Sequence, residues 1–270
     1  MGVLNLTPDS FSDGGRLAST ARALAAAERM VTQGADVLDL GGQSTRPGAA
    51  EVDDREEIRR VIPTLGAIRR QLEDRVPAGA RESRPLLSVD TFRPAVAEEA
   101  LATGVDWIND VRGGRGDPAL LALVAAAGCP YVLMHSRGTS ATMDALASYG
   151  DVAVDVRDEL LRATEAAMAA GLRRQQLIWD PGLGFAKTTA QNIALLKALP
   201  LLRAEGFPLL VGPSRKRFIG EVLAEPRPRA RLWGTAATVA RAIAGGADLV
   251  RVHDVGPIAQ TCRMADALWR

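Results

Sequence analysis

Polar and charged side chains recur at the ends of short apolar segments along the whole chain. They are Asn5, Asp39, Asp90, Asn109, His135, Asp180, Lys216, Arg251 and His253. Any single member is explained by ordinary solvation or by helix capping at the end of a strand. Because each apolar segment contributes to the set, the set as a whole predicts one polar site at the carboxyl ends of parallel strands.

The residue types in this set suit a flat, nitrogen-rich ring that carries an anionic group. Carboxylates and amides form paired, directional hydrogen bonds with N–H groups at the edge of such a ring. An arginine can lie flat against a ring while its guanidinium pairs with phosphate, which is the role expected of Arg251. Arg251 and His253 alternate along an extended segment and therefore face the same way, beside the start of the last expected helix. An anion site is expected there.

The stretch Phe207–Gly220, which reads FPLLVGPSRKRFIG, is the second candidate feature. Its apolar first half predicts a buried strand that ends at Gly212, and a Ser-Arg-Lys-Arg turn follows. From composition alone, a solvated basic turn explains this turn as well as a ligand site does. The polar residues at the other strand ends favour the ligand site, which suits an anionic substrate.

Eight short apolar segments alternate with amphipathic helices along the chain. The expected strands are Gly2–Leu6, Asp36–Leu40, Pro85–Asp90, Val105–Asn109, Tyr131–Met134, Leu177–Asp180, Leu209–Val211 and Asp248–Val252. The expected helices are Leu17–Gln33, Asp53–Asp74, Arg93–Thr103, Pro118–Ala127, Val152–Gly171, Ala190–Leu199, Arg229–Gly245 and Ile258–Trp269. This alternation, without a linker, predicts one α/β domain over residues 1–270, folded as a (β/α)8 TIM barrel. A doubly wound open sheet is the alternative, because alternation alone does not distinguish the two.

The composition narrows the class of partner. With 270 residues, 47% of them hydrophobic, the chain is long enough to bury a full core. A net charge of +1 without charged blocks argues against nucleic acid and membrane surfaces as partners. Cys129 and Cys262 fit no metal-binding spacing and indicate reduced thiols. No signal peptide or membrane-length apolar run is recognisable, so a cytoplasmic protein that acts on small molecules is expected.

Eight motifs occur in the order seen in the dihydropteroate synthase family, which the chain resembles from Gly2 to Gly256. They are GVLNLTPDSFSDGG, DLGGQSTRPGA, SVDT, INDVRGG, LMHSRGT, DPGLGFAKT, GPSRKRFIG and RVHDVG. The resemblance implies condensation of 6-hydroxymethyl-7,8-dihydropterin diphosphate with 4-aminobenzoate, giving 7,8-dihydropteroate and diphosphate. It also implies Mg²⁺ as cofactor, a TIM barrel, a homodimer and sulfonamide competition at the aminobenzoate site.

The resemblance also assigns roles to individual residues. For the pterin pocket it implies Asp90, Asn109, Met134, Asp180, Phe185, Lys216 and Arg251. For the diphosphate it implies Asn5, Arg251 and His253, with Asn5 as the Mg²⁺ ligand. For aminobenzoate and the two loops it implies Phe11, Thr45, Arg46, Pro47 and Arg217. The catalytic group is Lys216, Arg251, His253, Asp90 and Asp13. Asp39 is expected to support the pterin pocket through the second loop.

The implied mechanism needs no protein nucleophile. Mg²⁺, with Arg251 and His253, stabilises the departing diphosphate, and Asp90 stabilises the cationic pterin methylene that remains. Asp13 joins Asp90 once the first loop closes. The aminobenzoate amine then attacks in a site from which the two loops exclude water.

The chain departs from the family pattern at two positions. Gln43 stands where the family usually has Glu, so the anchoring of the second loop is expected to differ. Arg217 stands where relatives often have Ser, so contact with the aminobenzoate carboxylate is expected chiefly through the Arg217 backbone N–H.

Two other functions are alternatives to the synthase. A pterin-dependent methyltransferase shares the pterin-binding carboxylates but has no use for the Ser-Arg-Lys and Arg-Val-His segments at a diphosphate site. A non-catalytic pterin-binding paralogue is expected to lack functional residues such as Asn5 and Lys216, and both are present.

The last two expected helices are rich in large apolar residues. Trp233, Val239, Ile243 and Trp269 together predict a face for a homodimer. Core packing explains much of the same pattern.

Overall fold

The computed structural model describes residues 1–7, 20–44, 48–74 and 84–270. The strands are β1 (Gly2–Asn5), β2 (Val37–Gly41), β3 (Leu86–Asp90), β4 (Trp107–Asp110), β5 (Tyr131–Met134), β6 (Leu177–Asp180), β7 (Leu210–Val211) and β8 (Leu249–Val250). The α-helices are α1 (Thr20–Thr32), α2 (Asp54–Glu73), α3 (Pro94–Ala102), α4 (Pro118–Ala127), α5 (Val152–Ala169), α6 (Thr189–Lys197), α7 (Leu199–Arg203), α8 (Arg217–Leu223), α9 (Leu232–Ala244) and α10 (Val255–Trp269). Short 3-10 turns are η3 (Met143–Leu146), η4 (Arg174–Gln176) and η5 (Pro228–Arg231).

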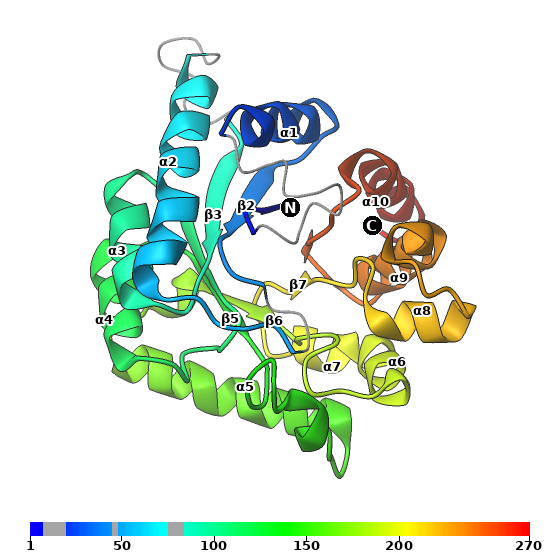
Figure 1. Ribbon diagram of the computed structural model, residues 1–270. Helices are drawn as coiled ribbons and strands as arrows, with labels where there is room; N and C mark the ends of the chain where they lie inside the picture. Colours follow the sequence, from blue (N-terminus) through cyan, green and yellow to red (C-terminus); the bar gives the residue numbers. More distant parts are fainter. Residues whose placement is uncertain (8–19, 45–47, 75–83) are drawn as a thin grey trace.

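The strands form a closed parallel barrel. Strands β1 to β6 pair in sequence order, and β7 pairs with β8. Parallel bridges between Trp179 and Leu209 and between Gly2 and Val252 join these two groups at both edges. The open doubly wound sheet is therefore excluded, and the predicted (β/α)8 barrel is confirmed. Figure 1 shows the helices as a ring around the strands.

Local sequence signals set the ends of several helices. In α4, Pro118 occupies the first turn, where its missing N–H costs nothing. The Asp117 side chain caps this helix by accepting a hydrogen bond from the Ala119 N–H at 2.9 Å. Gly128 ends it in the left-handed conformation, with φ of 69°. The predicted bounds of α4 are accordingly confirmed.

Successive side chains of each strand point alternately outward, into the main core beneath the helices, and inward, into the barrel interior. Leu38, Leu87, Ile108 and Leu133 are fully buried among the side chains of the main core. A separate apolar cluster holds Val132, Ile178 and Leu210, with Met1, Trp107 and Leu249 packed against it. Because side chains two residues apart share a face of a strand, the polar residues that follow this cluster project into the same interior. The cluster is thus the apolar floor beneath a polar barrel mouth.

The helices after β6 and β7 differ from the prediction. The expected helix Ala190–Leu199 corresponds to α6, which ends at Lys197, and a second short helix, α7, follows it from Leu199 to Arg203. Neither α7 nor α8 was predicted. Arg215 has φ of 60° just before α8, and Ala224 has φ of 51° just after it. The seven residues of α8 resemble a turn at the level of the sequence, because a helix this short shows little hydrophobic periodicity.

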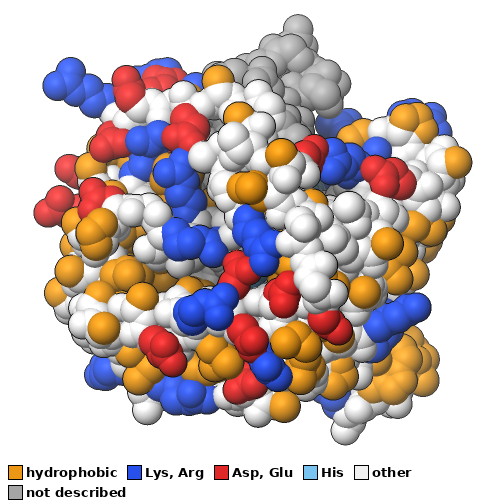
Figure 2. Space-filling view, turned by 90° about the horizontal axis from the view of Figure 1, so that it is seen from below, with side chains coloured by type: hydrophobic (Ala, Val, Ile, Leu, Met, Phe, Trp, Pro, Cys, Tyr) orange, Lys and Arg blue, Asp and Glu red, His pale blue; other side chains and the backbone are white. Residues whose placement is uncertain are grey.

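The surface carries charges of both signs. Figure 2 shows Lys and Arg side chains interspersed with Asp and Glu side chains over the face that it displays. On this face no large single-sign field is available to steer a polyanion. None of the helices that the structure describes is both long and apolar enough to cross a membrane.

Candidate active site

An inner pocket opens at the carboxyl ends of the barrel strands. Its lining comprises Asn109, Val111, Met134, Asp180, Gly182, Leu183, Phe185, Gly212, Lys216 and Arg251. Six of the seven residues predicted for the pterin are among them, and they come from β4, β5, β6 and the segments after β6, β7 and β8. The seventh, Asp90, lines the adjoining larger cleft together with Lys216 and Arg251. The structure therefore brings the seven together around one site.

Arg251 is the electrostatic centre of this site. Its Nε donates a hydrogen bond to Asp39 Oδ2 at 2.6 Å, and its Nη2 donates to Asp90 Oδ2 at 2.8 Å. The two buried carboxylates keep the guanidinium firmly charged and fix its plane. An arginine has five N–H donors, so those not used by the carboxylates remain for a ligand.

Asp39 does not act as the sequence predicted. Its carboxylate is fully buried and accepts hydrogen bonds from Ser88 Oγ at 2.6 Å and Asn109 Nδ2 at 3.2 Å, besides the one from Arg251. The expected route through the second loop is wrong, because these partners lie on β3, on β4 and directly after β8. Residues Asp39 and Ser88 are directly paired in the β2–β3 register, which brings their side chains together.

Asp180 is the last residue of β6, and Phe185 lies on the loop that follows it. The Gly182 N–H donates to Asp180 Oδ1 at 2.7 Å and orients that carboxylate at the pocket wall. A Cβ at Gly182 would lie 1.8 Å from the His135 carbonyl oxygen, so only glycine fits there. The Lys216 ammonium lies 4.2 Å from the centre of the Phe185 ring, within cation–π range. Lys216 is therefore turned inward, as predicted.

The larger cleft collects the residues predicted for an anion. Asn5, His253, Ser214, Arg217 and Arg251 are all part of its lining. Ser214 Oγ accepts a hydrogen bond from the His253 backbone N–H at 3.1 Å and lies 3.0 Å from His253 Nδ1. This contact orients the imidazole at the wall of the cleft. A role for Ser214 in holding His253 was missed, since the sequence assigned that residue only to shaping the turn.

Asn5 presents an uncommitted side chain to this cleft. Its backbone pairs with Gly41 in the β1–β2 register, and its carboxamide forms no hydrogen bond with any residue that the structure describes. Within the described residues no cluster of three or more His, Cys, Asp or Glu side chains could hold a metal ion. A single carboxamide oxygen fits Mg²⁺, which keeps several waters and takes most other ligands from substrate phosphates. The residues present thus fit a substrate-borne Mg²⁺.

Burial shifts the pKa values of three titratable groups in the pocket. It raises the pKa of Asp90 to about 7, although the nearby Arg251 acts in the opposite direction. It also raises the pKa of Asp180, against the hydrogen bond from Gly182. Burial lowers the pKa of Lys216 to about 8, although Asp180 opposes the shift. The site therefore changes charge near neutral pH, as functional sites often do.

Arg217 lies at the rim of the cleft and is already paired. Both of its terminal nitrogens lie 3.0 Å from the carboxylate oxygens of Asp144, which belongs to η3. Its guanidinium is half-exposed. Gln43, the other departure from the family pattern, accepts a hydrogen bond from the Val52 N–H at 3.3 Å. Gln43 thus still anchors the chain that returns from the second loop.

Five of the predicted site residues lie outside the described part of the chain. They are Phe11, Asp13, Thr45, Arg46 and Pro47. Their roles on the two loops remain predictions from the resemblance.

Comparison with known proteins agrees with this geometry. Residues 1–253 match the family described as pterin binding enzyme. The chain is 50% identical over 270 residues to the dihydropteroate synthase of Synechocystis sp., an alignment that covers 100% of this chain and 90% of that protein.

Two solved structures are similar over almost the whole chain. The dihydropteroate synthase of Yersinia pestis, determined as a sulfonamide drug complex, has a TM-score of 0.90 and 40% identity, covering 99% of this chain and 93% of that one. The Xanthomonas albilineans dihydropteroate synthase in complex with 7,8-dihydropteroate has a TM-score of 0.85 and 39% identity. The match covers 99% of this chain and 92% of that one. The chain therefore belongs to the pterin-binding enzymes and, among them, to the dihydropteroate synthase family.

Proposed function

We propose that this chain joins 6-hydroxymethyl-7,8-dihydropterin diphosphate to 4-aminobenzoate, forming 7,8-dihydropteroate and diphosphate. The observation that carries the proposal is the position of Arg251, which lines both the inner pocket and the larger cleft. A substrate with a flat ring and an anionic tail matches this arrangement, because one guanidinium contacts both parts. The relative from Xanthomonas albilineans, which binds 7,8-dihydropteroate, supports the same substrate class.

The inner pocket would hold the pterin ring. Asp180 and Asn109 offer a carboxylate and an amide to the N–H-bearing edge of the ring, and Lys216 offers a cation to its carbonyl oxygen. Met134 and Phe185 supply apolar walls above and beside the ring plane. This division of polar edge and apolar face is usual in pockets for flat heterocycles.

The larger cleft would hold the diphosphate. Asn5 is the proposed protein ligand of Mg²⁺, and Arg251 and His253 are the proposed donors to the phosphate oxygens. Bound Mg²⁺ would neutralise charge on those oxygens. Arg251 and His253 are held in place by Asp39, Asp90 and Ser214, so they need little reorganisation when the leaving group gains charge.

In the chemical step, the bond between the pterin methylene and the diphosphate oxygen breaks, and diphosphate leaves with the electron pair. The ionised Asp90 carboxylate stabilises the positive charge that this leaves on the methylene and ring. The amine nitrogen of 4-aminobenzoate then bonds to the methylene and releases one proton. Asp13, with Phe11 and the Thr45–Pro47 segment, is proposed to complete the site and exclude water.

Arg217 is proposed to receive the aminobenzoate carboxylate through its backbone N–H, at the start of α8. The same position would accept a sulfonamide, since the Yersinia pestis relative forms a sulfonamide drug complex. We propose sulfonamide competition with 4-aminobenzoate on this basis.

We propose that the enzyme is a cytoplasmic homodimer, formed through α8, α9 and α10. Exposed large apolar residues gather on these helices: Val222, Leu223, Trp233, Met264, Leu268 and Trp269. Trp233 is 78% exposed, whereas Val239 and Ile243 are buried in the core. The sequence-based dimer face was therefore wrong for Val239 and Ile243.

Sedimentation of the Trp233→Glu variant tests the dimer. The variant should sediment as a monomer, while the wild type and a Met168→Glu control on α5 remain dimeric. Met168 is a suitable control because it is also an exposed apolar residue, on a helix away from the proposed face. A monomeric wild type would contradict the proposal.

The pterin assignment is tested by substitution of Asn109 or Asp180. Either change to Ala should weaken binding of the pterin diphosphate by about 10- to 100-fold, since each removes hydrogen bonds in a buried pocket. Asp266→Ala, an exposed change on α10, is the control and should bind normally. Unchanged affinity in both pocket variants would overturn the assignment.

A further inference from the structure

Lysine is rare in this chain, and its distribution is uneven. The chain has 33 lysine and arginine residues in total. Thirty of them are arginine, and the three lysines are Lys187, Lys197 and Lys216. Lys197 is exposed on the last turn of α6, and Lys216 belongs to the site described above. Lys187 is 3% exposed and has no assigned role. In a chain that otherwise uses arginine, a buried lysine indicates a place that a guanidinium does not fit.

The Lys187 ammonium is surrounded by three acceptors. Nζ lies 2.9 Å from His135 Nδ1 and 3.0 Å from each of the carbonyl oxygens of Gly182 and Phe185. An ammonium has three N–H donors, so each finds one acceptor. The planar fork of an arginine could not point at three acceptors that converge on one atom.

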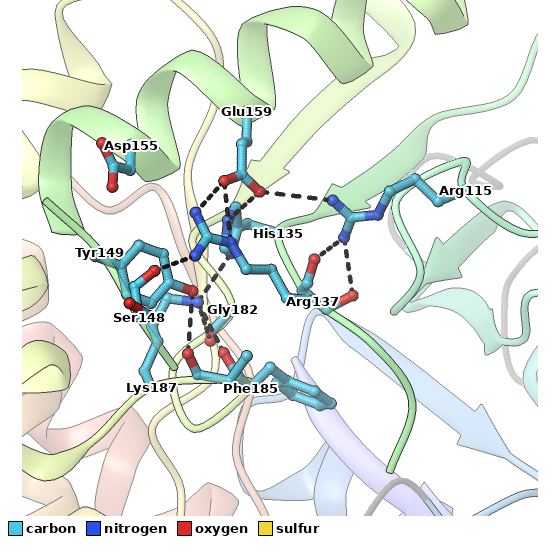
Figure 3. A network of polar contacts seen from close by, with 12 residues as sticks. Arg115, His135, Arg137, Ser148, Tyr149, Asp155, Glu159, Gly182, Phe185 and Lys187 are labelled. Atoms are coloured by element: carbon cyan, nitrogen blue, oxygen red, sulfur yellow. Dashed lines mark hydrogen bonds and ion pairs between the residues drawn. The ribbon is translucent and has the colours of Figure 1, made fainter. Parts of the chain in front are cut away.

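His135 and Glu159 support this lysine from behind. His135 Nε2 lies 3.0 Å from Glu159 Oε2, so the imidazole donates from Nε2 and accepts from Lys187 at Nδ1. Glu159 also receives hydrogen bonds from the Arg137 guanidinium. Figure 3 shows Glu159, His135 and Lys187 in this order, between α5 and the loop after β6. From the sequence, His135 is expected only as one of the polar residues at the strand ends.

The loop that Lys187 holds is strained. Gly182, Gly184 and Ala186 have φ of 66°, 78° and 49°, so three left-handed residues alternate within five positions. For Ala186, which has a side chain, this conformation costs about 1 kcal/mol. The Tyr149 hydroxyl donates to the Ala186 carbonyl at 3.0 Å, which adds a second brace. The same loop orients Asp180 and carries Phe185, so its conformation determines the shape of the pterin pocket.

We propose that Lys187 is a positioning residue for pterin binding: its ammonium, supported by His135 and Glu159, holds residues 181–187 in the conformation that presents Phe185 and orients Asp180. The inference rests on the pterin assignment of the inner pocket proposed above. Lys187 acts through the loop, because all three of its donors are used within the protein.

The charges that face Lys187 make its role sensitive to pH. Burial lowers the pKa of Lys187 to about 7; Asp180 and Glu159 oppose this shift, while Lys216 and Arg137 add to it. Burial, followed by the charge of Lys187, lowers the pKa of His135 to about 4, so the imidazole is neutral above pH 5. Partial burial acts to raise the pKa of Glu159, but the hydrogen bonds from His135 and Arg137 lower it to about 2. Of this cluster, Lys187 therefore changes charge first as the pH rises past 7.

The test measures binding of the pterin diphosphate with Mg²⁺ and without aminobenzoate, from pH 6 to pH 9. Compared with wild type at pH 6, Lys187→Met should bind about tenfold or more weakly, whereas Lys197→Met should bind normally. The ratio of wild-type to Lys187→Met affinity should decline as the pH rises and approach one, with a midpoint near 7. Lys216 titrates in both proteins, so it affects this ratio only through its charge interaction with Lys187. In steady-state assays, the KM for aminobenzoate should stay within about twofold of wild type.

A second variant, Glu159→Gln, separates positioning from a merely structural role. It keeps an acceptor for His135 but removes the negative charge that favours protonated Lys187, so the midpoint of the wild-type transition should move to lower pH. This variant also tests the inference if Lys187→Met fails to fold. Arg should not replace Lys187, and Lys187→Arg should bind as weakly as Lys187→Met.

Asn109→Ala distinguishes the two ways in which the inference could fail. If Asn109→Ala weakens pterin binding while a folded Lys187→Met binds like wild type, the role of Lys187 is overturned and the pocket assignment stands. If Asn109→Ala also binds like wild type, the pocket assignment fails, and with it the basis of the inference. An unmoved midpoint in Glu159→Gln would overturn the support from Glu159.

Discussion

Arg251 Nε lies 2.6 Å from Asp39 Oδ2, although 212 positions separate the two residues in the sequence. The pair crosses the barrel mouth from the end of β8 to the middle of β2. Through Asp39, Arg251 is connected to Ser88 and Asn109, and through its own Nη2 to Asp90. The residue proposed to bind the diphosphate is thus positioned by the same carboxylate that positions part of the pterin pocket.

Asp39→Asn should weaken catalysis although Asp39 does not line either pocket. A hydrogen bond to a charged group is worth about 1.5–3 kcal/mol, so kcat/KM for the pterin diphosphate should fall about 10- to 150-fold. The melting temperature should fall by roughly 5 °C. Steady-state kinetics and a thermal melt measure both effects.

The matched control is Asp36→Asn, because Asp36 is exposed at the opposite end of the same strand. Its kinetics should equal those of the wild type. Normal kinetics in Asp39→Asn would show that Arg251 does not depend on Asp39.

The pH dependence of catalysis should reveal Lys216. Its pKa of about 8 lies below the 10.5 of a free lysine because the group is buried, with Asp180 acting in the opposite direction. If protonated Lys216 binds the pterin, kcat/KM for the pterin diphosphate should fall above pH 8. Lys216→Arg should lose the part of this decline that is centred near pH 8, since a guanidinium stays charged, and should run at a lower plateau.

The stability of the protein should change in the opposite direction over the same window. Between pH 8 and 10.5 the unfolded chain holds a proton on Lys216 that the folded chain has lost, so the contribution of Lys216 to the free energy of unfolding rises with pH. Urea unfolding of wild type and Lys216→Arg measures this difference. A Lys216→Arg enzyme that keeps the decline in activity near pH 8 would exclude Lys216 as its source.

Asp144→Ala should improve the use of aminobenzoate. Asp144 binds the Arg217 guanidinium, so its removal frees a cation at the position proposed for the substrate carboxylate. Because an exposed ion pair is worth about 1 kcal/mol or less, the KM for aminobenzoate should fall by up to about fivefold. Asp158→Ala, on the outer face of α5, should leave this KM unchanged. A raised KM in Asp144→Ala would mean that the ion pair itself helps to form the aminobenzoate site.

Removal of Mg²⁺ should stop turnover, and its return should restore it. Asn5→Ala should raise the Mg²⁺ concentration needed for the half-maximal rate by about tenfold, because it removes the proposed protein ligand. Binding of 6-hydroxymethylpterin, which lacks the diphosphate, should be unaffected in this variant. An unchanged Mg²⁺ requirement in Asn5→Ala would remove Asn5 from the metal site.

The alternation of strands and helices and most members of the site could be predicted from the sequence, because both depend on local patterns. Each strand is a short apolar segment, and most site residues, such as Asp90 and Asp180, stand at the end of one. The parallel order of the strands then places these ends together without further information. The closure of the barrel could not be predicted, since it depends on pairing between Gly2 and Val252 at opposite ends of the chain.

The contacts between side chains within the site could not be predicted from the sequence. Asp39 and Arg251 are paired because the barrel closes. No local sequence pattern indicates with which carboxylate a given arginine forms an ion pair. Lys187 follows the DPGLGFA segment and read as an ordinary loop residue, although its ammonium is buried against His135. The scarcity of lysine in the chain was the signal that could have singled it out. The helix α8 was missed because seven residues show too little periodicity.

The most direct test of the account is whether the purified chain makes dihydropteroate. With the pterin diphosphate, 4-aminobenzoate and Mg²⁺, the wild type should release 7,8-dihydropteroate and diphosphate in equal amounts, and folded Asp180→Ala should be strongly impaired at low pterin concentration. A folded wild-type enzyme that binds the pterin diphosphate but forms no dihydropteroate would contradict the account and favour a non-catalytic pterin-binding protein.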